Sequence, residues 1–288
     1  MGRVYDAMCE SQREAGISSA VLDVSGLLPG PVAAPGVERK PLGEGIAWEK
    51  VASFPLIARD KARLAALDGG SSLGAEKFRL LKARMRHLQE RQKVKRVVVT
   101  SAVPEEGKTL VSTNLAISLA RHTSQRVLLL EGDLHQPALA ERLGLLGRPG
   151  ISEWFDQDEA IHSFLYQAED LQLWVLPAGE TPEHPLAILQ SPRFLDLLQQ
   201  LSHCFDWILI DAPPLTPLAD VNYWSKQSDG LLLVVREGKT PRKILQKGLE
   251  TLDAARVLGI VFNEVREVEQ NYYSKYYGPP EAKKRSRG

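Results

Sequence analysis

From residue 94 to about 265, short apolar runs alternate with stretches whose apolar residues recur every three or four positions. The apolar runs, such as Trp207-Ile-Leu-Ile210, are typical of strands buried on both faces of a sheet. They predict strands at 95–100, 126–131, 171–176, 206–211, 230–236 and 258–263. The periodic stretches predict helices at 109–121, 137–143, 185–202, 217–227 and 240–254. The pattern therefore predicts an α/β protein with a mostly parallel central sheet and helices on both faces.

The two ends of the chain lack this alternation. Residues 1 to about 70 carry five prolines and no sustained period, which predicts an extended or disordered arm. A helix is expected over 71–92, because serines can cap its start and apolar residues recur at helical spacing. We therefore expect three parts: an arm at 1–70, a main domain with its leading helix at 71–268, and a tyrosine-rich basic tail at 269–288.

Composition narrows the class of protein. Lys and Arg number 36 and so do Asp and Glu, so a general nucleic-acid binder is not indicated. The two cysteines, Cys9 and Cys204, make no disulfide framework and fit a reducing cytoplasm. No apolar run approaches the length of about 20 residues that spans a membrane, and acidic residues interrupt any signal peptide. We expect a soluble intracellular protein.

A phosphate-binding loop is the strongest chemical signal. Residues 102–109 read Ala-Val-Pro-Glu-Glu-Gly-Lys-Thr and stand between a predicted strand and a predicted helix. Backbone N–H groups at a helix N-terminus carry partial positive charge and bind phosphates. Lys108 adds a full charge for the β- and γ-phosphates, and Thr109 adds a hydroxyl for Mg²⁺. The loop predicts a nucleoside triphosphate site, although Ala102 replaces the first glycine of the usual pattern.

Two further loops end predicted strands with carboxylates. The first contains Glu131 and Asp133, which could hold Mg²⁺ or accept a proton from a hydroxyl. The alternative is a solvated turn in which Asp133 caps the next helix. The second loop follows four apolar residues and begins with Asp211, whose carboxylate is expected to reach the metal. Carboxyl ends of parallel strands meet at one edge, where such sheets bind ligands.

Together these residues resemble the cytoplasmic kinase module of bacterial tyrosine autokinases, which regulate capsule and exopolysaccharide synthesis. The similarity runs from roughly Glu76 to Tyr277. Besides the three loops it includes Leu143-Gly-Leu145, Gly150-Ile-Ser152, Leu176-Pro-Ala-Gly179 and Val235-Arg-Glu-Gly-Lys-Thr240. Septum-positioning and chromosome-partitioning ATPases share the loops but not the tyrosine-rich tail. The resemblance implies a P-loop NTPase fold with ATP and Mg²⁺ as cofactors.

The resemblance also implies roles for single residues. Lys108 holds the phosphates, Asp133 accepts the tyrosine proton, and Asp211 completes the catalytic set. The nucleotide contacts are Glu106, Gly107, Lys108, Thr109, Leu110 and Asn263. The metal contacts are Thr109, Glu131 and Asp211. Three residues near the expected site of phosphoryl transfer depart from the family pattern. Glu105 replaces a common glycine, Glu131 a common aspartate, and His135 a common arginine.

The tail supplies a candidate substrate. Four tyrosines lie within six residues, at Tyr272, Tyr273, Tyr276 and Tyr277. They could be phosphoacceptors, a docking peptide or an accident of composition. The resemblance implies that the tail of one subunit is phosphorylated in the active site of a neighbour. The alternatives to a kinase are a non-kinase ATPase switch and a nucleotide-binding adaptor.

Assembly and location complete the expectation. Residues 149–192 contain no Lys or Arg, whereas the helix at 71–92 is basic. The resemblance implies that this helix docks on the next subunit through Glu76, Arg79 and Lys82. The alternative is that the helix is solvated and makes no contact with another subunit. The resemblance implies a homo-oligomer activated by a membrane polysaccharide co-polymerase or chain-length regulator, with a tyrosine phosphatase as a further partner and no nucleic acid. It places the protein in the cytoplasm, peripheral at the inner face of the membrane.

Overall fold

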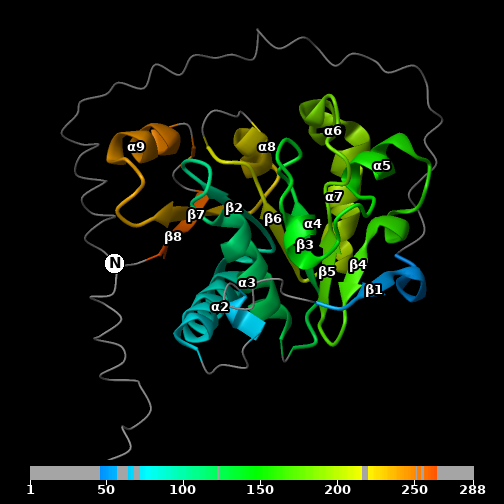
Figure 1. Cartoon of the computed structure of the whole chain (residues 1–288), viewed down its shortest axis with the longest axis horizontal. Coiled ribbons are helices and arrows are strands. Elements are labelled where there is room, and N and C mark those ends of the chain that lie inside the picture. Colours follow the sequence, from blue (N-terminus) through cyan, green and yellow to red (C-terminus); the bar gives the residue numbers. More distant parts are fainter. Residues whose placement is uncertain are drawn as a thin grey trace, which may run out of the picture. The chain divides into compact units, whose positions relative to one another are not determined.

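The fold was analysed in a computed structural model (Figure 1), which describes residues 46–56, 64–67, 72–121, 123–215, 220–250, 252–253 and 256–264. All described residues belong to one unit, Glu44–Gly288. The four tail tyrosines lie outside the described residues.

An eight-stranded sheet forms the centre of this unit, with the strand order β1-β4-β5-β3-β6-β2-β7-β8. Every neighbouring pair is parallel except β4 and β5, which are antiparallel. The predicted mostly parallel sheet is therefore confirmed. The strands are β1 Ala52–Phe54, β2 Arg96–Ser101, β3 Val127–Glu131, β4 Tyr166–Ala168, β5 Leu173–Leu176, β6 Trp207–Asp211, β7 Gly230–Arg236 and β8 Val257–Asn263.

Helices cover both faces of the sheet, as the unbroken apolar runs predicted (Figure 1). One face carries η3 Ala65–Leu67, α2 Leu73–Gln92, α3 Lys108–Ala120 and α4 Leu139–Leu143. The other face carries α5 Ile151–Asp156, η4 Ile161–Phe164, α6 Pro185–Gln190, α7 Pro192–Cys204, α8 Asp220–Lys226 and α9 Arg242–Glu250.

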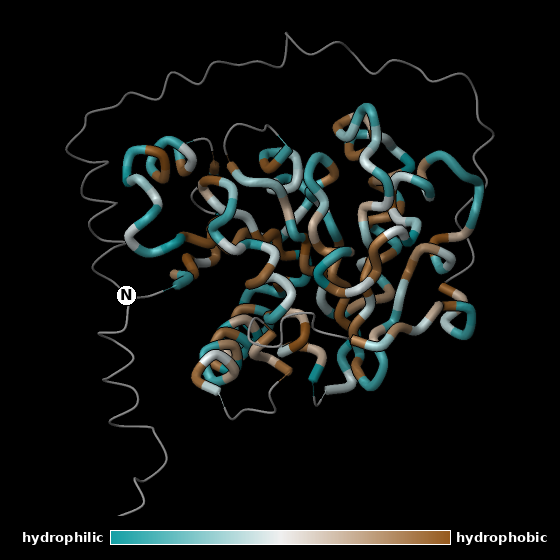
Figure 2. The backbone as a smooth tube through the Cα atoms, viewed as in Figure 1, coloured by the Kyte–Doolittle hydropathy of each residue, from teal (hydrophilic) through white to brown (hydrophobic). Residues whose placement is uncertain are grey.

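Alternate strand residues supply two separate hydrophobic cores. In β2, Val97 and Val99 pack in the core beneath α3, whereas Val98 packs in the core on the opposite face. All three side chains are fully buried, and each contributes roughly 1.5–3 kcal/mol through the area removed from water. Figure 2 shows the hydrophobic strands in the middle and hydrophilic segments toward the outside. A strand buried on both sides has no polar alternation, which explains the sequence pattern.

The start of α2 agrees with the sequence prediction. Ser72 is the N-cap, and its hydroxyl accepts a hydrogen bond from the Ala75 N–H at 3.2 Å. The helix ends at Lys93, which adopts a left-handed conformation with φ 55°. The helix predicted over 71–92 is therefore confirmed. It packs against α3.

The single helix predicted at 185–202 is wrong. The structure has two helices, α6 and α7, separated at Ser191. Pro192 has no N–H to donate to a preceding turn, so it begins a new helix instead of continuing the old one. Ser191 caps that new helix, because its hydroxyl accepts a hydrogen bond from the Phe194 N–H at 3.1 Å.

Part of the predicted N-terminal arm belongs to the sheet. Within 46–56, β1 pairs with β4 at the sheet edge, so an extended or disordered arm is wrong for these residues. Trp48 anchors the segment, since its ring meets those of Trp174 and Phe205 edge-on and lies under the guanidinium of Arg126 at 4.4 Å. The remainder of the arm up to residue 45 lies outside the described residues.

Candidate active site

Sheet order brings the three predicted loops together. Strands β3, β6 and β2 are neighbours, and the loops all leave their carboxyl ends. The register pairs Glu131 with Asp211, and Val99 with Asp211. Residues 80 and 112 positions apart in the chain therefore meet at one edge of the sheet, where parallel sheets bind their ligands.

The phosphate loop has a left-handed backbone at two positions. Gly107 has φ 92° and Glu105 has φ 63°. A Cβ on Gly107 would lie 2.2 Å from the Asn263 amide nitrogen, so both conformation and space require glycine there. Lys108 begins α3 directly afterwards, which leaves the first N–H groups of that helix available for a phosphate. The loop therefore fits an anion, and Thr109 and Leu110 lie in this first turn as predicted.

Lys108 lies beside the carboxylate loop. Its Nζ is 2.9 Å from Asp133 Oδ2, and both side chains are largely buried. Burial lowers the pKa of Lys108, but the nearby Asp211 and Asp133 carboxylates outweigh it, so the net pKa is raised. Lys108 therefore stays protonated and positioned at the phosphate loop.

Asp211 is a buried carboxylate with one oxygen unused. Burial raises its pKa despite the opposing charge of Lys108, and the hydroxyls of Thr109 and Ser112 hydrogen-bond to the carboxylate. Its Oδ1 atom has no hydrogen-bond partner within the described part of the chain. An orphaned carboxylate oxygen beside a threonine hydroxyl fits a hard cation such as Mg²⁺. No cluster of three or more His, Cys, Asp or Glu occurs among the described residues, so phosphate oxygens and water would have to complete the shell.

The metal contact expected of Glu131 stays a prediction, and in this structure its carboxylate binds backbone N–H groups. Its Oε1 accepts hydrogen bonds from the backbone N–H groups of Ala138 and Leu139 at 2.6 and 2.5 Å. Its Oε2 accepts from the N–H of Ala178 at 3.0 Å. Both oxygens therefore accept hydrogen bonds from the backbone, and burial raises the pKa of Glu131. The extra methylene that distinguishes glutamate from aspartate carries this carboxylate to the start of α4, where it ties three segments together.

Asp133 and His135 occupy the same loop with different partners. The second oxygen of Asp133 accepts from the Gln136 N–H at 3.1 Å. The alternative of a solvated turn in which Asp133 caps the next helix is wrong, because Asp133 is buried and α4 has Ala138 as its N-cap. His135 Nε2 lies 2.8 Å from Asp220 Oδ2 at the start of α8. This contact joins the carboxylate loop to α8.

Glu106 and Asn263 contact the loop itself. The Glu106 side chain is buried and accepts from the Val103 N–H at 3.0 Å. The Asn263 amide donates to the Glu106 carbonyl at 2.9 Å. Their predicted contacts with a nucleotide stay predictions, and in this structure both side chains stabilise the loop. Ser112 and Thr240 were missed by the sequence analysis; Ser112 could have been found because it lies one helical turn after Thr109.

The predicted oligomer contacts have partners within the chain. Arg79 forms an ion pair with Glu76 on the exposed side of α2. Lys82 donates to the Arg121 carbonyl at 2.9 Å, and burial together with nearby arginines lowers its pKa. Docking on a neighbour through these residues stays a prediction, and Lys82 contributes to the packing of α2 on α3.

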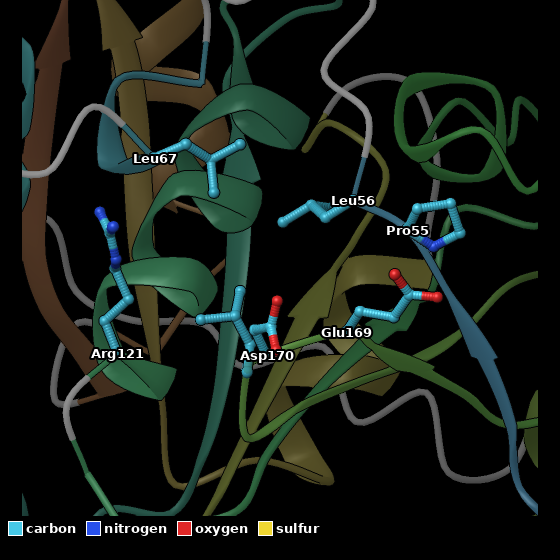
Figure 3. Close-up of a pocket in the computed structure, with 7 residues that line it drawn as sticks. Pro55, Leu56, Leu67, Arg121, Glu169 and Asp170 are labelled. Atoms are coloured by element: carbon cyan, nitrogen blue, oxygen red, sulfur yellow. The ribbon is translucent and has the colours of Figure 1, made fainter.

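A separate cleft lies at the opposite end of α3. It has a volume of about 380 Å³ and is lined by Pro55, Leu56, Leu67, Arg121, Glu169, Asp170 and Leu171 (Figure 3). The 13 residues of α3 place it roughly 20 Å from the phosphate loop. The Arg121 guanidinium donates to the Ala66 carbonyl at 2.5 Å, and two carboxylates share the cleft. This cleft is therefore not a phosphate site.

Comparisons with known proteins agree with this geometry. No protein-family model matches the chain. The tyrosine-protein kinase YwqD of Bacillus subtilis is 26% identical over 223 residues, which cover 77% of this chain and 93% of that protein. The tyrosine-protein kinase CpsD of Streptococcus pneumoniae serotype 4 is 30% identical over 187 residues, which cover 63% of this chain and 80% of that protein.

A solved structure and a longer relative add to this. The VpsO kinase domain superimposes with a TM-score of 0.59 and 30% identity, covering 68% of this chain and all of that one. The succinoglycan biosynthesis transport protein ExoP of Rhizobium meliloti is 28% identical over 217 residues, or 74% of this chain. The chain spans only 28% of the length of ExoP, so most of that relative lies outside the matched region.

Proposed function

This chain belongs to the family of bacterial tyrosine-protein kinases, and we propose that it transfers the γ-phosphoryl group of ATP to tyrosine hydroxyls with Mg²⁺. The observation that carries the proposal is the buried trio of Lys108, Asp133 and Asp211 at the phosphate loop. Phosphoryl transfer depends mainly on positioning and charge neutralisation, and these side chains provide both.

Each residue of the trio has a distinct part. Lys108 neutralises phosphate charge, and Thr109 and Asp211 would hold Mg²⁺, which supplies further neutralisation of the phosphates when bound. A phosphate in the loop competes with Asp133 for the Lys108 ammonium. The Asp133 oxygen that it releases is then available to accept the proton of an incoming tyrosine hydroxyl. Glu131 holds the backbone at the start of α4 and at Ala178 in this scheme, and its metal contact stays a prediction.

The substrate that we propose is the tail, presented by a neighbouring subunit. Tyr272 is the ninth residue after Asn263, which ends β8 at the same edge as the phosphate loop. Four tyrosines in six residues offer several acceptors to one site. Each phosphate would add roughly −1.5 to −2 charge to a basic tail and so change its association.

The proposed setting is exopolysaccharide or capsule synthesis at the inner face of the membrane. The name of ExoP, a succinoglycan biosynthesis transport protein, supports this setting. No helix in the described ranges is long and apolar enough to cross a membrane. We propose that a membrane polysaccharide co-polymerase recruits and activates the kinase as a homo-oligomer, and that a tyrosine phosphatase reverses the reaction.

The direct test is incubation of the purified protein with Mg²⁺ and ATP, followed by mapping of phosphotyrosine. Lys108→Met is the control, because it removes the phosphate-binding charge without adding a new one. Phosphotyrosine in the tail of the wild type alone supports the proposal. Phosphate release without phosphotyrosine in the wild type would refute the kinase assignment.

A nucleotide-dependent switch is the second candidate. It is favoured by one observation, the hydrogen bonds that engage both Glu131 oxygens with backbone N–H groups at the start of α4 and at Ala178. A site with fewer metal carboxylates can bind nucleotide and yet transfer phosphate slowly. ATP hydrolysis that changes partner binding, without phosphotyrosine, is the result expected of a switch.

A further inference from the structure

Glu106 is a buried carboxylate for which phosphate binding gives no reason. Its side chain projects from the phosphate loop, and the residue is only 3% exposed. Phosphates are bound by backbone N–H groups and lysine, to which a carboxylate adds only repulsion. A buried carboxylate is also costly unless donors satisfy its oxygens. Another task must therefore account for this side chain.

The donors to Glu106 come from two parts of the chain. One oxygen accepts the N–H of Val103, within the phosphate loop itself, at 3.0 Å. The other accepts the hydroxyl of Thr240, more than 130 residues further along, in the turn between β7 and α9. The N–H of Arg236 approaches this same oxygen at 3.4 Å. The carboxylate thus joins the phosphate loop to the end of β7.

Backbone atoms of the loop are held from the same side. Asn263 donates its amide to the Glu106 carbonyl at 2.9 Å, and the Arg236 guanidinium reaches the Glu105 carbonyl at 3.5 Å. Arg236 in turn forms an ion pair with Glu264, directly after β8. Two successive loop residues are therefore fixed by the ends of β7 and β8.

The loop needs such support because of its conformation. Glu105 is left-handed, which an L-residue adopts only at a cost, and Gly107 is left-handed beside it. Without external contacts the chain would populate other conformations, and only the fraction in the binding conformation would accept a phosphate. The apparent dissociation constant rises in inverse proportion to that fraction.

We propose that Glu106 and Thr240 form a clamp that holds the phosphate loop in its nucleotide-binding conformation, with Thr240 as a positioning residue that does not touch the nucleotide. This inference rests on the proposed nucleotide site. It adds a residue outside the three loops to the machinery of that site.

Thr240→Val and Thr240→Ser make a matched pair for the test. Valine keeps the shape of threonine and removes the hydroxyl, whereas serine keeps the hydroxyl. Calorimetric titration of the full chain with Mg²⁺ and ADP measures affinity without requiring kinase activity. We expect Thr240→Val to weaken binding about tenfold, which corresponds to ~1.4 kcal/mol. Thr240→Ser should stay within about twofold of the wild type because it keeps the hydroxyl that Glu106 accepts. The neighbouring variant Lys239→Ala should also stay within about twofold, since an exposed substitution changes the free energy by only a few tenths of a kcal/mol.

Kinetics separate positioning from general damage. Thr240→Val should raise KM for ATP by the same factor and leave kcat unchanged at saturating ATP, because bound nucleotide itself orders the loop. Glu106→Gln should show the same split, since glutamine has one acceptor oxygen and cannot accept from both the Val103 N–H and the Thr240 hydroxyl. Unchanged affinity in Thr240→Val, or equal weakening by valine and serine, overturns the clamp. A wild type that binds no nucleotide refutes the proposed function instead.

Discussion

Replacement of Glu105 by glycine should stabilise the protein. Glu105 has φ 63°, a left-handed conformation that costs an L-residue roughly 1–2 kcal/mol and glycine almost nothing. Glycine also gives the unfolded chain more conformational freedom, which offsets about 0.5–1 kcal/mol of this gain in stability. The expected net gain in the free energy of unfolding is therefore about 0.5–1 kcal/mol. For a domain of this size that corresponds to a rise of roughly 1–4 °C in Tm.

Glu105→Ala is the matched control, because alanine removes the charge and keeps the backbone strain. Both variants retain the Glu105 carbonyl that accepts from Arg236. Both should bind ATP roughly twofold to fivefold more tightly, since an exposed negative charge next to a polyphosphate repels it through screened solvent. Only the glycine variant should gain stability.

Urea denaturation of the three proteins without nucleotide provides the assay. The midpoint should rise for Glu105→Gly and stay close to the wild type for Glu105→Ala. If alanine stabilises as much as glycine, charge rather than backbone strain governs this position. A glycine variant less stable than the wild type would show that the left-handed conformation carries no cost, and the reasoning would be refuted.

Three further variants test other parts of the account. Asp211→Asn should change how the stability of the nucleotide-free protein depends on pH, because burial raises the pKa of the Asp211 carboxyl. A raised pKa in the folded state means that the wild type loses stability as the pH rises, so in melts between pH 3 and pH 7 the wild type should lose stability relative to the variant as the pH rises. The same variant should lose the Mg²⁺ dependence of nucleotide binding in calorimetry; retained dependence would place the metal elsewhere. Trp48→Ala should lower the free energy of unfolding by about 2 kcal/mol, since the Trp48 ring packs on Trp174 and Phe205. Trp48→Phe should recover part of that loss. Equal melting temperatures of the wild type and both variants would show that residues 46–56 do not stabilise the sheet. Arg79→Glu should lower the sedimenting mass at low salt if α2 docks on a neighbouring subunit, and an unchanged mass would remove α2 from the interface.

The strands and loops of the site were predictable because their signals are local. A strand buried on both faces, such as β6, needs a continuous apolar run, and Lys108 must follow a glycine at a helix start. The edge strand β1 was not predictable, because its three residues depend on pairing with β4 and on the contacts of Trp48. Short segments of this kind gain their structure from tertiary packing rather than from their own pattern.

The roles of single carboxylates were harder to predict. The resemblance implies a metal contact for Glu131, whereas in the structure its carboxylate accepts from backbone donors at the start of α4. The partner of Glu106 lies more than 130 residues away, and no spacing rule connects it to Thr240. Contacts between distant segments follow from sheet order, which a single sequence specifies only through the whole fold.

Phosphotyrosine mapping in a mixed reaction tests the central claim most directly. One protein carries Lys108→Met with an intact tail, and the other carries an intact site with Tyr272, Tyr273, Tyr276 and Tyr277 changed to Phe. Incubation with Mg²⁺ and ATP, with and without membranes from the source cells, should place phosphate on the tail of the Lys108→Met protein only when the other is present. ATP hydrolysis in the mixture with no phosphotyrosine on that tail would contradict the account.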